Sequence, residues 1–396
     1  MAGFSVQRYA PERSAFAKLT ARDSVLRRLD WPLLLSALAL CLIGSLLVWS
    51  ATRNRTNINQ GDPYFFLIRH IANAGIGLCL MVGTIWLGHR TLRGAVPILY
   101  GLSILMLLAV LSPLGATVNG AHSWIVLGGG FSLQPSEFAK IAIILCMAML
   151  LAARVDAGDQ LHPDHRTVVK SLGIALIPIC CIMLMPDLGS TMVILVIILG
   201  VLLASGASNR WIFGLLGAGV VGAVLVAALG ILDKYQINRF AAFANPKLDP
   251  AGVGYNTGQA RIAIGSGGLT GTGLFKGSQT TGQFVPEQQT DFVFTVAGEE
   301  LGFVGAGLII VLLGVILWRA CRIARETTEL YGTIVAAGII AWFAFQSFEN
   351  IGMTLGIMPV AGIPLPFVSY GGSSMFAVWV AIGLLQSIRV QRPITA

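Results

Sequence analysis

The sequence predicts an all-α fold: a polytopic membrane helix bundle of about ten transmembrane helices, with a long extracytoplasmic loop between the seventh and eighth. The chain is 55% hydrophobic and only 11% charged, whereas about a quarter of the residues in a soluble domain are charged. It also contains many apolar runs of roughly 18 to 25 residues, the length that crosses a hydrocarbon core of about 30 Å. Backbone in lipid must satisfy its own hydrogen bonds, so these runs are expected to be helices and the strand content close to nil.

Ten runs meet this requirement along the chain. We place the spans near residues 31–51, 65–87, 93–115, 136–153, 169–186, 188–207, 210–231, 293–318, 330–353 and 372–388. Together they predict one transmembrane domain over residues 31–388.

The orientation follows from the distribution of positive charge. Residues 1–30 are basic and lead into the first span without a small-residue cleavage site, so they read as a partly disordered cytoplasmic tail rather than a signal peptide. Most of the 26 Lys and Arg residues lie in this tail, in alternate loops and in the end 389–396. The positive-inside rule then puts both termini in the cytoplasm. The large loop 232–292 and the loops 116–135 and 354–371 fall outside the cell.

Composition excludes several other classes of protein. The six cysteines all lie in apolar runs without the spacing of a zinc site. His162 and His165 stand in a short polar loop with Asp159 and Asp164, which reads as a solvated turn rather than a metal site. The net charge of +8 is spread over short loops, so it indicates membrane topology and no nucleic-acid partner.

Charged residues within or beside the spans are the sharpest functional signal, because each costs a few kcal/mol in the bilayer (about 3 for a charge at its centre). Glu137 and Lys140 stand three residues apart and can pair on one helix face. A structural ion pair and a ligand-binding pair are equal alternatives for them. Asp187 is expected to cap the helix that follows it.

Three further acids lie near the outer ends of spans. For Glu299 and Glu300, we expect one side chain to face water and the other the bundle. Glu349 is expected to form a hydrogen bond across helices.

The large loop contains a glycine-rich run between two cations. Gly265 to Gly273 holds five glycines in nine residues, with Arg261 before it and Lys276 after it. Exposed backbone N–H groups and cations predict a phosphate or pyrophosphate site. The alternative is a set of tight turns over a re-entrant helix.

Two outer residues have an ambiguous role on their own. Asp291 stands between a polar run and the apolar start of a span, where a partly desolvated carboxylate can serve as a general base. It can equally be an acid at a helix N-terminus. Trp124 fits a membrane-interface aromatic or a platform on which a sugar stacks.

Six separated motifs resemble the SEDS family, which comprises RodA, FtsW and SpoVE. The matching stretches are NGAHSWIVLGGGFSLQPSEFAK, PDLGST, NRFAAFANPKLDPAGVGYN, AIGSGGLTGTG, VPEQQTDFVFTVAGEELGFVG and GIMPVAGIPLPFVSYGGSS, in residues 119–140, 186–191, 238–256, 263–273, 285–305 and 356–374. The last of these is most similar to the elongation member, RodA. The resemblance covers nearly the whole chain except the basic tail.

The resemblance implies a peptidoglycan glycosyltransferase that polymerises lipid II at the outer face of the cytoplasmic membrane, for cell elongation and shape. It also implies a class B penicillin-binding protein as the transpeptidase partner. The family's essential acid matches Asp291, its functional tryptophan matches Trp124, and the acid and lysine of its QPSE motif match Glu137 and Lys140.

The expected chemistry is attack of a sugar hydroxyl on the anomeric carbon of a second lipid-linked glycan. Asp291 removes the proton, and Lys140, Arg261 and Lys276 are the candidate cations for the leaving pyrophosphate. Glu287 is counted with the substrate-binding residues. A divalent cation, Mg²⁺ or Mn²⁺, bridging Asp291 and the pyrophosphate is compatible with this chemistry, but the sequence holds no dedicated metal cage.

Two departures from the family and two alternatives remain open. Many members have His where this chain has Gln289, and Arg where it has Ser123, so those roles are not carried over. The main alternative function is a lipid II flippase, which needs polar groups along the whole depth of the bilayer. A third interpretation is a scaffold that recruits the transpeptidase without catalysis.

Overall fold

The computed structural model describes residues 25–392, apart from residue 57 and residues 119–120, 129–130, 186, 229–242 and 244–251. Most of the basic tail, the start of the large loop and the last four residues therefore lie outside the described residues. In chain order, the described α-helices are α2 (Val25–Arg28), α3 (Trp31–Thr52), α4 (Phe65–Leu87), α5 (His89–Leu111), α6 (Pro135–Asp156), α7 (His165–Met183), α8 (Leu188–Ala204), α9 (Asn209–Ala228), α11 (Val253–Ser266), α12 (Ser278–Thr281), α13 (Val293–Val296), α14 (Gly302–Glu326), α15 (Leu330–Leu355) and α16 (Gly372–Val390). A π-helix, η2 (Ala297–Leu301), joins α13 to α14.

The predicted multi-pass helical fold is confirmed. Among the described residues, eight helices are long and apolar enough to cross a membrane, and α8 is a shorter apolar helix of 17 residues. The 20-residue helix α9 coincides with the remaining predicted span. The apolar runs identified the helices because only a helix satisfies the backbone of such a run in lipid.

The strand content is low, as expected, but the loop at 116–135 forms a short sheet that the sequence did not predict. Strands β1 (Gly115–Val118), β2 (Ala121–Gly128) and β3 (Phe131–Leu133) form one antiparallel sheet in the order β1-β2-β3. Ala116 pairs with Trp124, and Val126 pairs with Ser132. The hydrocarbon rule applies only to lipid-exposed backbone, and this segment lies beyond the ends of the spans, where a hairpin is allowed.

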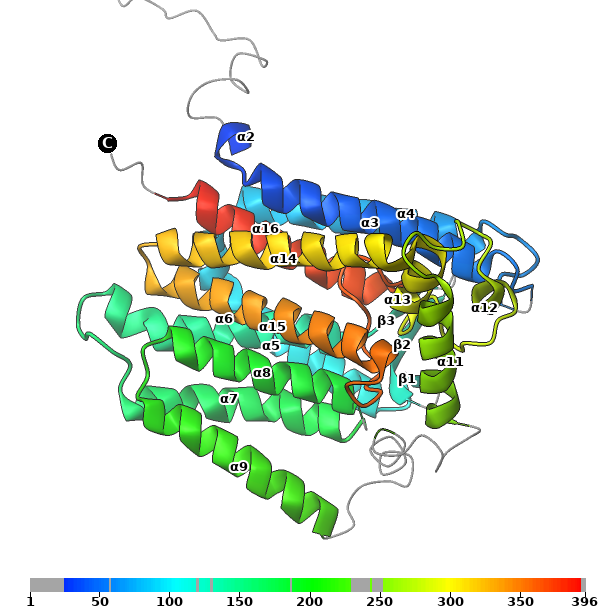
Figure 1. Cartoon of the computed structure of the whole chain (residues 1–396). Coiled ribbons are helices and arrows are strands. Elements are labelled where there is room, and N and C mark those ends of the chain that lie inside the picture. Colours follow the sequence, from blue (N-terminus) through cyan, green and yellow to red (C-terminus); the bar gives the residue numbers. More distant parts are fainter. Residues whose placement is uncertain are drawn as a thin grey trace, which may run out of the picture.

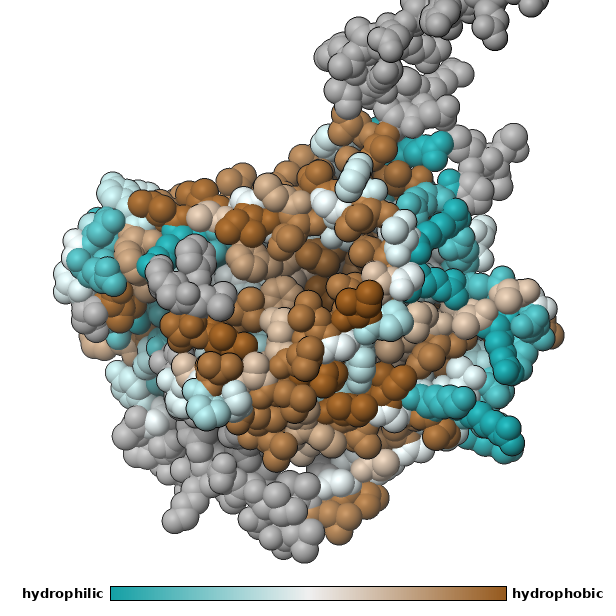
Figure 2. Space-filling model, turned by 180° about the vertical axis from the view of Figure 1, so that it is seen from behind, coloured by the Kyte–Doolittle hydropathy of each residue, from teal (hydrophilic) through white to brown (hydrophobic). Residues whose placement is uncertain are grey.

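The sheet and the short helices α11 to α13 gather at one end of the bundle, and α2 and the C-terminal end of α16 lie at the other (Figure 1). We refer to these as the loop end and the tail end. Between them, one face of the molecule presents a broad hydrophobic band, with hydrophilic residues towards both ends (Figure 2). This distribution is that of a protein surrounded by lipid at mid-height.

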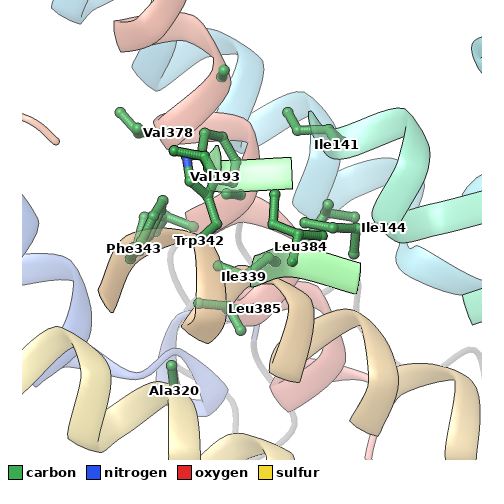
Figure 3. Packing of buried hydrophobic residues seen from close by; sticks show 14 of the residues in the cluster. Ile141, Ile144, Val193, Ala320, Ile339, Trp342, Phe343, Val378, Leu384 and Leu385 are labelled. Atoms are coloured by element: carbon green, nitrogen blue, oxygen red, sulfur yellow. The ribbon is translucent and has the colours of Figure 1, made fainter. Parts of the chain in front are cut away.

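The core lies where α6, α8, α14, α15 and α16 meet. Figure 3 shows Ile141 and Ile144 from α6, Trp342 and Phe343 from α15, and Val193 from α8 gathering in it. Glycines allow close helix contacts there: a Cβ on Gly200 of α8 would lie 2.5 Å from the Cβ of Ala341 in α15. Small residues at such crossings are typical of membrane helix packing.

An ion-pair network closes the tail end. Asp30, fully buried before α3, accepts hydrogen bonds from Arg319 Nε at 2.9 Å and Nη2 at 2.7 Å, and Arg389 Nη1 lies 3.0 Å from the same carboxylate. Its carboxylate also caps α3 by accepting from the N–H of Leu33. Gln386 completes the set, accepting from the N–H of Asp30 and donating to its carbonyl. The network ties α3, α14 and α16 together.

Candidate active site

Asp291 ends a tight turn at the loop end. The carbonyl of Glu287 accepts hydrogen bonds from the N–H groups of Thr290, Asp291 and Phe292, and Glu287 itself has a positive φ of 48°. Asp291 is half-buried and stands two residues before α13. The turn therefore presents the predicted acid at the boundary between the helix bundle and the outer loops, beside the start of a helix.

The side chain of Glu287 points back into its own turn. Its carboxylate accepts from Gln289 Nε2 at 3.2 Å and from Thr290 Oγ1 at 3.3 Å. The carbonyl of Gln289 in turn accepts from the N–H of Tyr370, at 2.8 Å. Glu287, predicted to bind substrate, thus also stabilises the turn that carries Asp291.

Arg55, which sequence reasoning missed, is buried against this turn. It follows α3, and its Nη2 donates to the carbonyl of Val285 at 2.8 Å, while the side-chain oxygens of Gln288 and Gln289 lie 3.5 Å from its guanidinium. Burial lowers the pKa of Arg55, and the Glu287 carboxylate opposes this by raising it. The available signal was an arginine in the loop directly after a span, but only the tertiary fold links it to the turn.

The side chain of Asn350 in α15 holds the backbone of Asp291 in place. Its fully buried side chain donates to the carbonyl of Asp291 and to the carbonyl of Ile363, both at 2.8 Å. One amide therefore joins the turn of the predicted catalytic acid to the segment after α15. Sequence analysis missed this residue, although Gln346 and Asn350 stand four apart in an apolar span and so share one helix face.

Glu137 and Lys140 form the predicted pair in the first turns of α6. Lys140 Nζ lies 2.7 Å from Glu137 Oε1, and both side chains are almost fully buried. Lys140 also donates to Gln346 Oε1 at 3.1 Å and stands 4.8 Å from the ring centre of Trp342. The second oxygen of Glu137 has no hydrogen-bond partner within the part of the chain that the structure describes.

The two groups are connected through α15 and the segment after it. Gln346, which contacts Lys140, donates to the carbonyl of Pro364, and Asn350 donates to that of the adjacent Ile363. A buried polar row thus runs from the Glu137–Lys140 pair to the turn of Asp291. Hydrogen bonds link the Glu137–Lys140 pair to the backbone of Asp291 through α15.

Glu349 lies in the same part of α15 and does not behave as expected. It is fully buried, and neither carboxylate oxygen has a hydrogen-bond partner among the described residues, so the expected bond across helices is not formed there.

Three helix N-termini meet beside this row. The N–H of Gln134, before α6, donates to Ser373 Oγ at the start of α16, and its side chain donates to Asp187. Asp187 caps α8, as predicted, by accepting from the N–H of Ser190 at 2.9 Å. The partial positive charge at each N-terminus favours anions in this region.

Trp124 is held by the outer sheet. It is half-buried in β2, and β2 lies against α5 and α6. The neighbouring β3 touches the start of α16, where Ser373 Oγ donates to the carbonyl of Ser132 at 3.5 Å. Trp124 therefore belongs to the same end of the bundle as the polar row, at the water boundary.

The glycine run is packed against backbone rather than open to an anion. The N–H groups of Thr272 and Gly273 donate to the carbonyls of Glu299 and Glu300 in η2. A Cβ on Gly267 would lie 2.0 Å from the carbonyl oxygen of Gly298. These contacts favour the alternative weighed from the sequence, tight turns packed against a helix, because the N–H groups of Gly271, Thr272 and Gly273 already donate to backbone carbonyls.

The two cations beside the run are placed differently from each other. Arg261 donates to the carbonyls of Leu355 and Gly356, at 3.1 and 2.9 Å, and so caps the C-terminus of α15. Lys276 is exposed at the loop end. No described hydrogen bond joins either residue to the polar row around Lys140, so of the three candidate cations only Lys140 lies in it.

Glu299 and Glu300 are both buried, so the expectation that one faces water was wrong. Glu299 accepts from the N–H groups of Gln279 and Thr280, at 2.7 and 2.9 Å. Glu300 accepts from Ser50 Oγ of α3 at 2.6 Å. The π-helix turns both side chains inward, where they bind the α12 segment and α3. The sequence did not predict the π-helix, because a single extra residue in an apolar run leaves no signal.

The chain departs from the family at Ser123, where many members have Arg, and at Gln289, where many have His. Neither residue replaces the side chain that those members have. Ser123 and Gln289 are both buried, and Gln289 contacts Arg55. For a divalent cation, the described residues contain no group of three or more His, Cys, Asp or Glu side chains that could hold it.

Comparison with known proteins identifies the family. A family model for FtsW, RodA and SpoVE, described as a cell cycle protein, matches residues 31–393. The chain belongs to this FtsW/RodA/SpoVE family. Among its relatives, stage V sporulation protein E of Bacillus subtilis is 39% identical over 91% of this chain and 96% of its own. The peptidoglycan glycosyltransferase MrdB of Escherichia coli is 37% identical over 95% and 96%.

Solved structures of the family have the same fold. Rod shape determining protein RodA of Thermus thermophilus matches with a TM-score of 0.65 and 30% identity, over 91% of this chain and 96% of that one. A chain from a peptidoglycan synthase complex, in work on the coordination of polymerization and crosslinking, matches with a TM-score of 0.73 and 30% identity over 91% and 97%. The chain is therefore a multi-pass membrane protein of this family. Relatives from different branches match at similar identity, so the comparisons do not separate elongation from division.

Proposed function

We propose that the protein is a peptidoglycan glycosyltransferase that polymerises lipid II, with Asp291 as the catalytic base. The observation that carries this proposal is the buried row from Glu137 and Lys140 through Gln346 and Asn350 to the turn of Asp291. An acid held at one end and a cation at the other match the two charges that a glycosyl transfer from pyrophosphate develops. Names of relatives as peptidoglycan glycosyltransferases support it.

A sugar hydroxyl of one lipid-linked glycan attacks the anomeric carbon of another, and Asp291 accepts the hydroxyl proton. The bond from that carbon to the pyrophosphate oxygen breaks, and the leaving group takes the electron pair. Lys140 and the N-termini of α6, α8 and α16 stabilise the pyrophosphate. Trp124 supplies a surface on which a sugar ring stacks at the water boundary.

We further propose that the loop end is extracytoplasmic and that both termini are cytoplasmic. The tail end collects the basic loops, which the positive-inside rule assigns to the cytoplasm. The partner is proposed to be a class B penicillin-binding protein acting as transpeptidase, in keeping with the peptidoglycan synthase complex to which the chain is similar. A role in elongation is part of this proposal, based on the GIPLPFVSYGGSS motif.

The flippase alternative requires polar groups through the depth of the bilayer. Within the described residues, the buried polar row lies at the loop end and the ion-pair network at the tail end. Between them lies the apolar cluster around Ile144, Ile339 and Trp342. This separation favours chemistry at one face over a transport path.

One reconstitution distinguishes the three functions. The purified chain, with its class B partner and lipid II, is expected to form glycan strands, while the partner alone forms none. Strands formed equally by the partner alone would make this chain a scaffold. Movement of lipid II across vesicle membranes without strand formation would make it a flippase.

A further inference from the structure

A pocket of about 490 Å³ lies between α7 and α9 at the tail end, away from the candidate active site. Its lining combines an imidazole, a guanidinium, an indole ring and three apolar residues. The lining residues are His165 of α7 and Arg210, Trp211, Gly214, Leu215 and Ala218 of α9. None of the functional residues discussed above belongs to it.

The surroundings of α9 show how an occupant can reach this pocket. In Figure 1, α9 runs obliquely away from the rest of the bundle, and its main described contacts are with α8. Apolar side chains along it are exposed, among them Phe213 at 71%, Val220 at 66% and Val224 at 62%. In a membrane protein such a surface faces hydrocarbon chains, so the pocket is accessible from the bilayer.

The polar part of the pocket consists of hydrogen-bond donors. Trp211 Nε1 donates to His165 Nδ1 at 2.9 Å, which leaves Nε2 of the neutral imidazole as the nitrogen that carries its proton. The guanidinium of Arg210 is exposed beside it. Asp164, one residue before His165, caps α7, and its hydrogen bonds from Thr167 hold the pKa of that carboxyl below its usual range. Its charge is thus directed to the helix N-terminus, and the described lining residues of the pocket include no acid.

The apolar part forms a shallow track along α9. Trp211, Gly214, Leu215 and Ala218 follow the spacing of one helix face. A Cβ on Gly214 would meet nothing within 4 Å, so this face leaves room beside the helix. A donor-rich head site that continues into an apolar track is complementary to an amphiphile with an anionic head.

We propose that this pocket binds an anionic phospholipid of the bilayer. Arg210 and His165 contact the phosphate, and one acyl chain lies along Gly214, Leu215 and Ala218. Basic pockets between transmembrane helices bind such headgroups, and a tryptophan at this depth is typical of the membrane interface. The lipid would fill the space between α7 and α9 that the described side chains leave open.

Native mass spectrometry of the full chain, with phosphatidylglycerol and phosphatidylcholine as probes, tests the proposal. The wild type is expected to retain phosphatidylglycerol in preference to phosphatidylcholine. Arg210→Gln is expected to lower phosphatidylglycerol binding about fivefold, the contribution of one basic residue at an anionic headgroup, whereas Arg210→Lys retains most of it. The matched control is Arg325→Gln, an exposed arginine in the last turn of α14 at the same end, which leaves binding unchanged.

Three outcomes would overturn the proposal. Equal retention of the two phospholipids by the wild type would remove the anionic preference. Equal losses of phosphatidylglycerol binding in Arg210→Gln and Arg325→Gln would show that the preference reflects only the net charge of the protein. Binding of undecaprenyl pyrophosphate that depends on Arg210, without binding of phosphatidylglycerol, would assign the pocket to an isoprenoid carrier instead.

Discussion

The two ends of the bundle both bury charged groups, but they use them differently. At the tail end, the carboxylate of Asp30 accepts from Arg319, Arg389 and the N–H of Leu33, and Gln386 satisfies its backbone. At the loop end, Glu137 has one oxygen and Glu349 both oxygens without a partner among the described side chains and backbone.

This difference separates a structural role from a functional one. Burying a charge is costly wherever it occurs, and a fold that offsets the cost fully, as around Asp30, has no remaining capacity for a ligand. Buried groups with unused hydrogen-bonding capacity, beside a lysine and three helix N-termini, are expected where a ligand completes the set. The comparison therefore supports the proposal that the loop end carries the chemistry and that the tail-end network serves stability.

The largest expected effect on stability comes from Arg319→Ala. It leaves Asp30 buried without its bidentate partner, which costs about 3–5 kcal/mol of unfolding free energy. Thermal unfolding in detergent measures the loss. The control is Arg322→Ala, which removes an exposed pair with Glu326 and is expected to cost less than about 1 kcal/mol. Equal losses would contradict the structural role of the tail-end network.

Lys140→Met, unlike Arg319→Ala, is expected to act mainly on activity. Polymerisation falls about 10²- to 10³-fold, because a cation that stabilises the leaving pyrophosphate is removed. The variant also leaves Glu137 buried without its partner, so the double variant Glu137→Gln, Lys140→Met is expected to regain stability but not activity. Recovery of activity in the double variant would make the pair purely structural.

Asn350→Ala sharpens the comparison within the loop end. The change removes both hydrogen bonds that join Asp291 and Ile363 to α15. A small displacement of a catalytic group is expected to lower kcat about 10- to 100-fold with little change in KM. An unchanged kcat would show that Asn350 does not position Asp291.

The smallest expected effect is that of Arg55→Lys. Lysine keeps the charge but not the three contacts with the turn at 285–289, so activity is expected to fall about tenfold. Arg53→Lys is the matched control in the same loop, where Arg53 stacks on Phe275 instead. Similar losses in both variants would show that the loop, and not Arg55, is sensitive.

The sequence was sufficient to predict the helices. A span needs about 20 apolar residues, and this requirement placed most of the long helices within a few residues of their observed bounds. The exception is the span predicted at 293–318, because α13 and η2 occupy its start and α14 runs from Gly302 to Glu326. The requirement did not predict the sheet at 115–133 or the π-helix at 297–301, because short strands outside the hydrocarbon and one extra residue in a helix leave no strong periodic signal. The capping role of Asp187 was predicted because it depends only on local spacing.

The site was predictable only in part. The pairing of Glu137 with Lys140 is a local, three-residue relation, and it was predicted. The contacts of Arg55 and Asn350 with the turn of Asp291 join residues far apart in the chain, so they required the fold. The role of the glycine run stayed open in the sequence because glycine serves close backbone packing as well as anion binding, and composition does not distinguish the two.

Strand formation from lipid II by Asp291→Asn, reconstituted with the class B partner, tests the central claim most directly. Asp62→Asn, which changes an exposed aspartate in the loop between α3 and α4, is the matched control. The account predicts that Asp291→Asn folds and binds its partner but loses at least about 10²-fold in rate, the typical contribution of a general base, while Asp62→Asn retains activity. Strand formation by Asp291→Asn at a rate close to that of the wild type would contradict the assignment of Asp291 as the catalytic base.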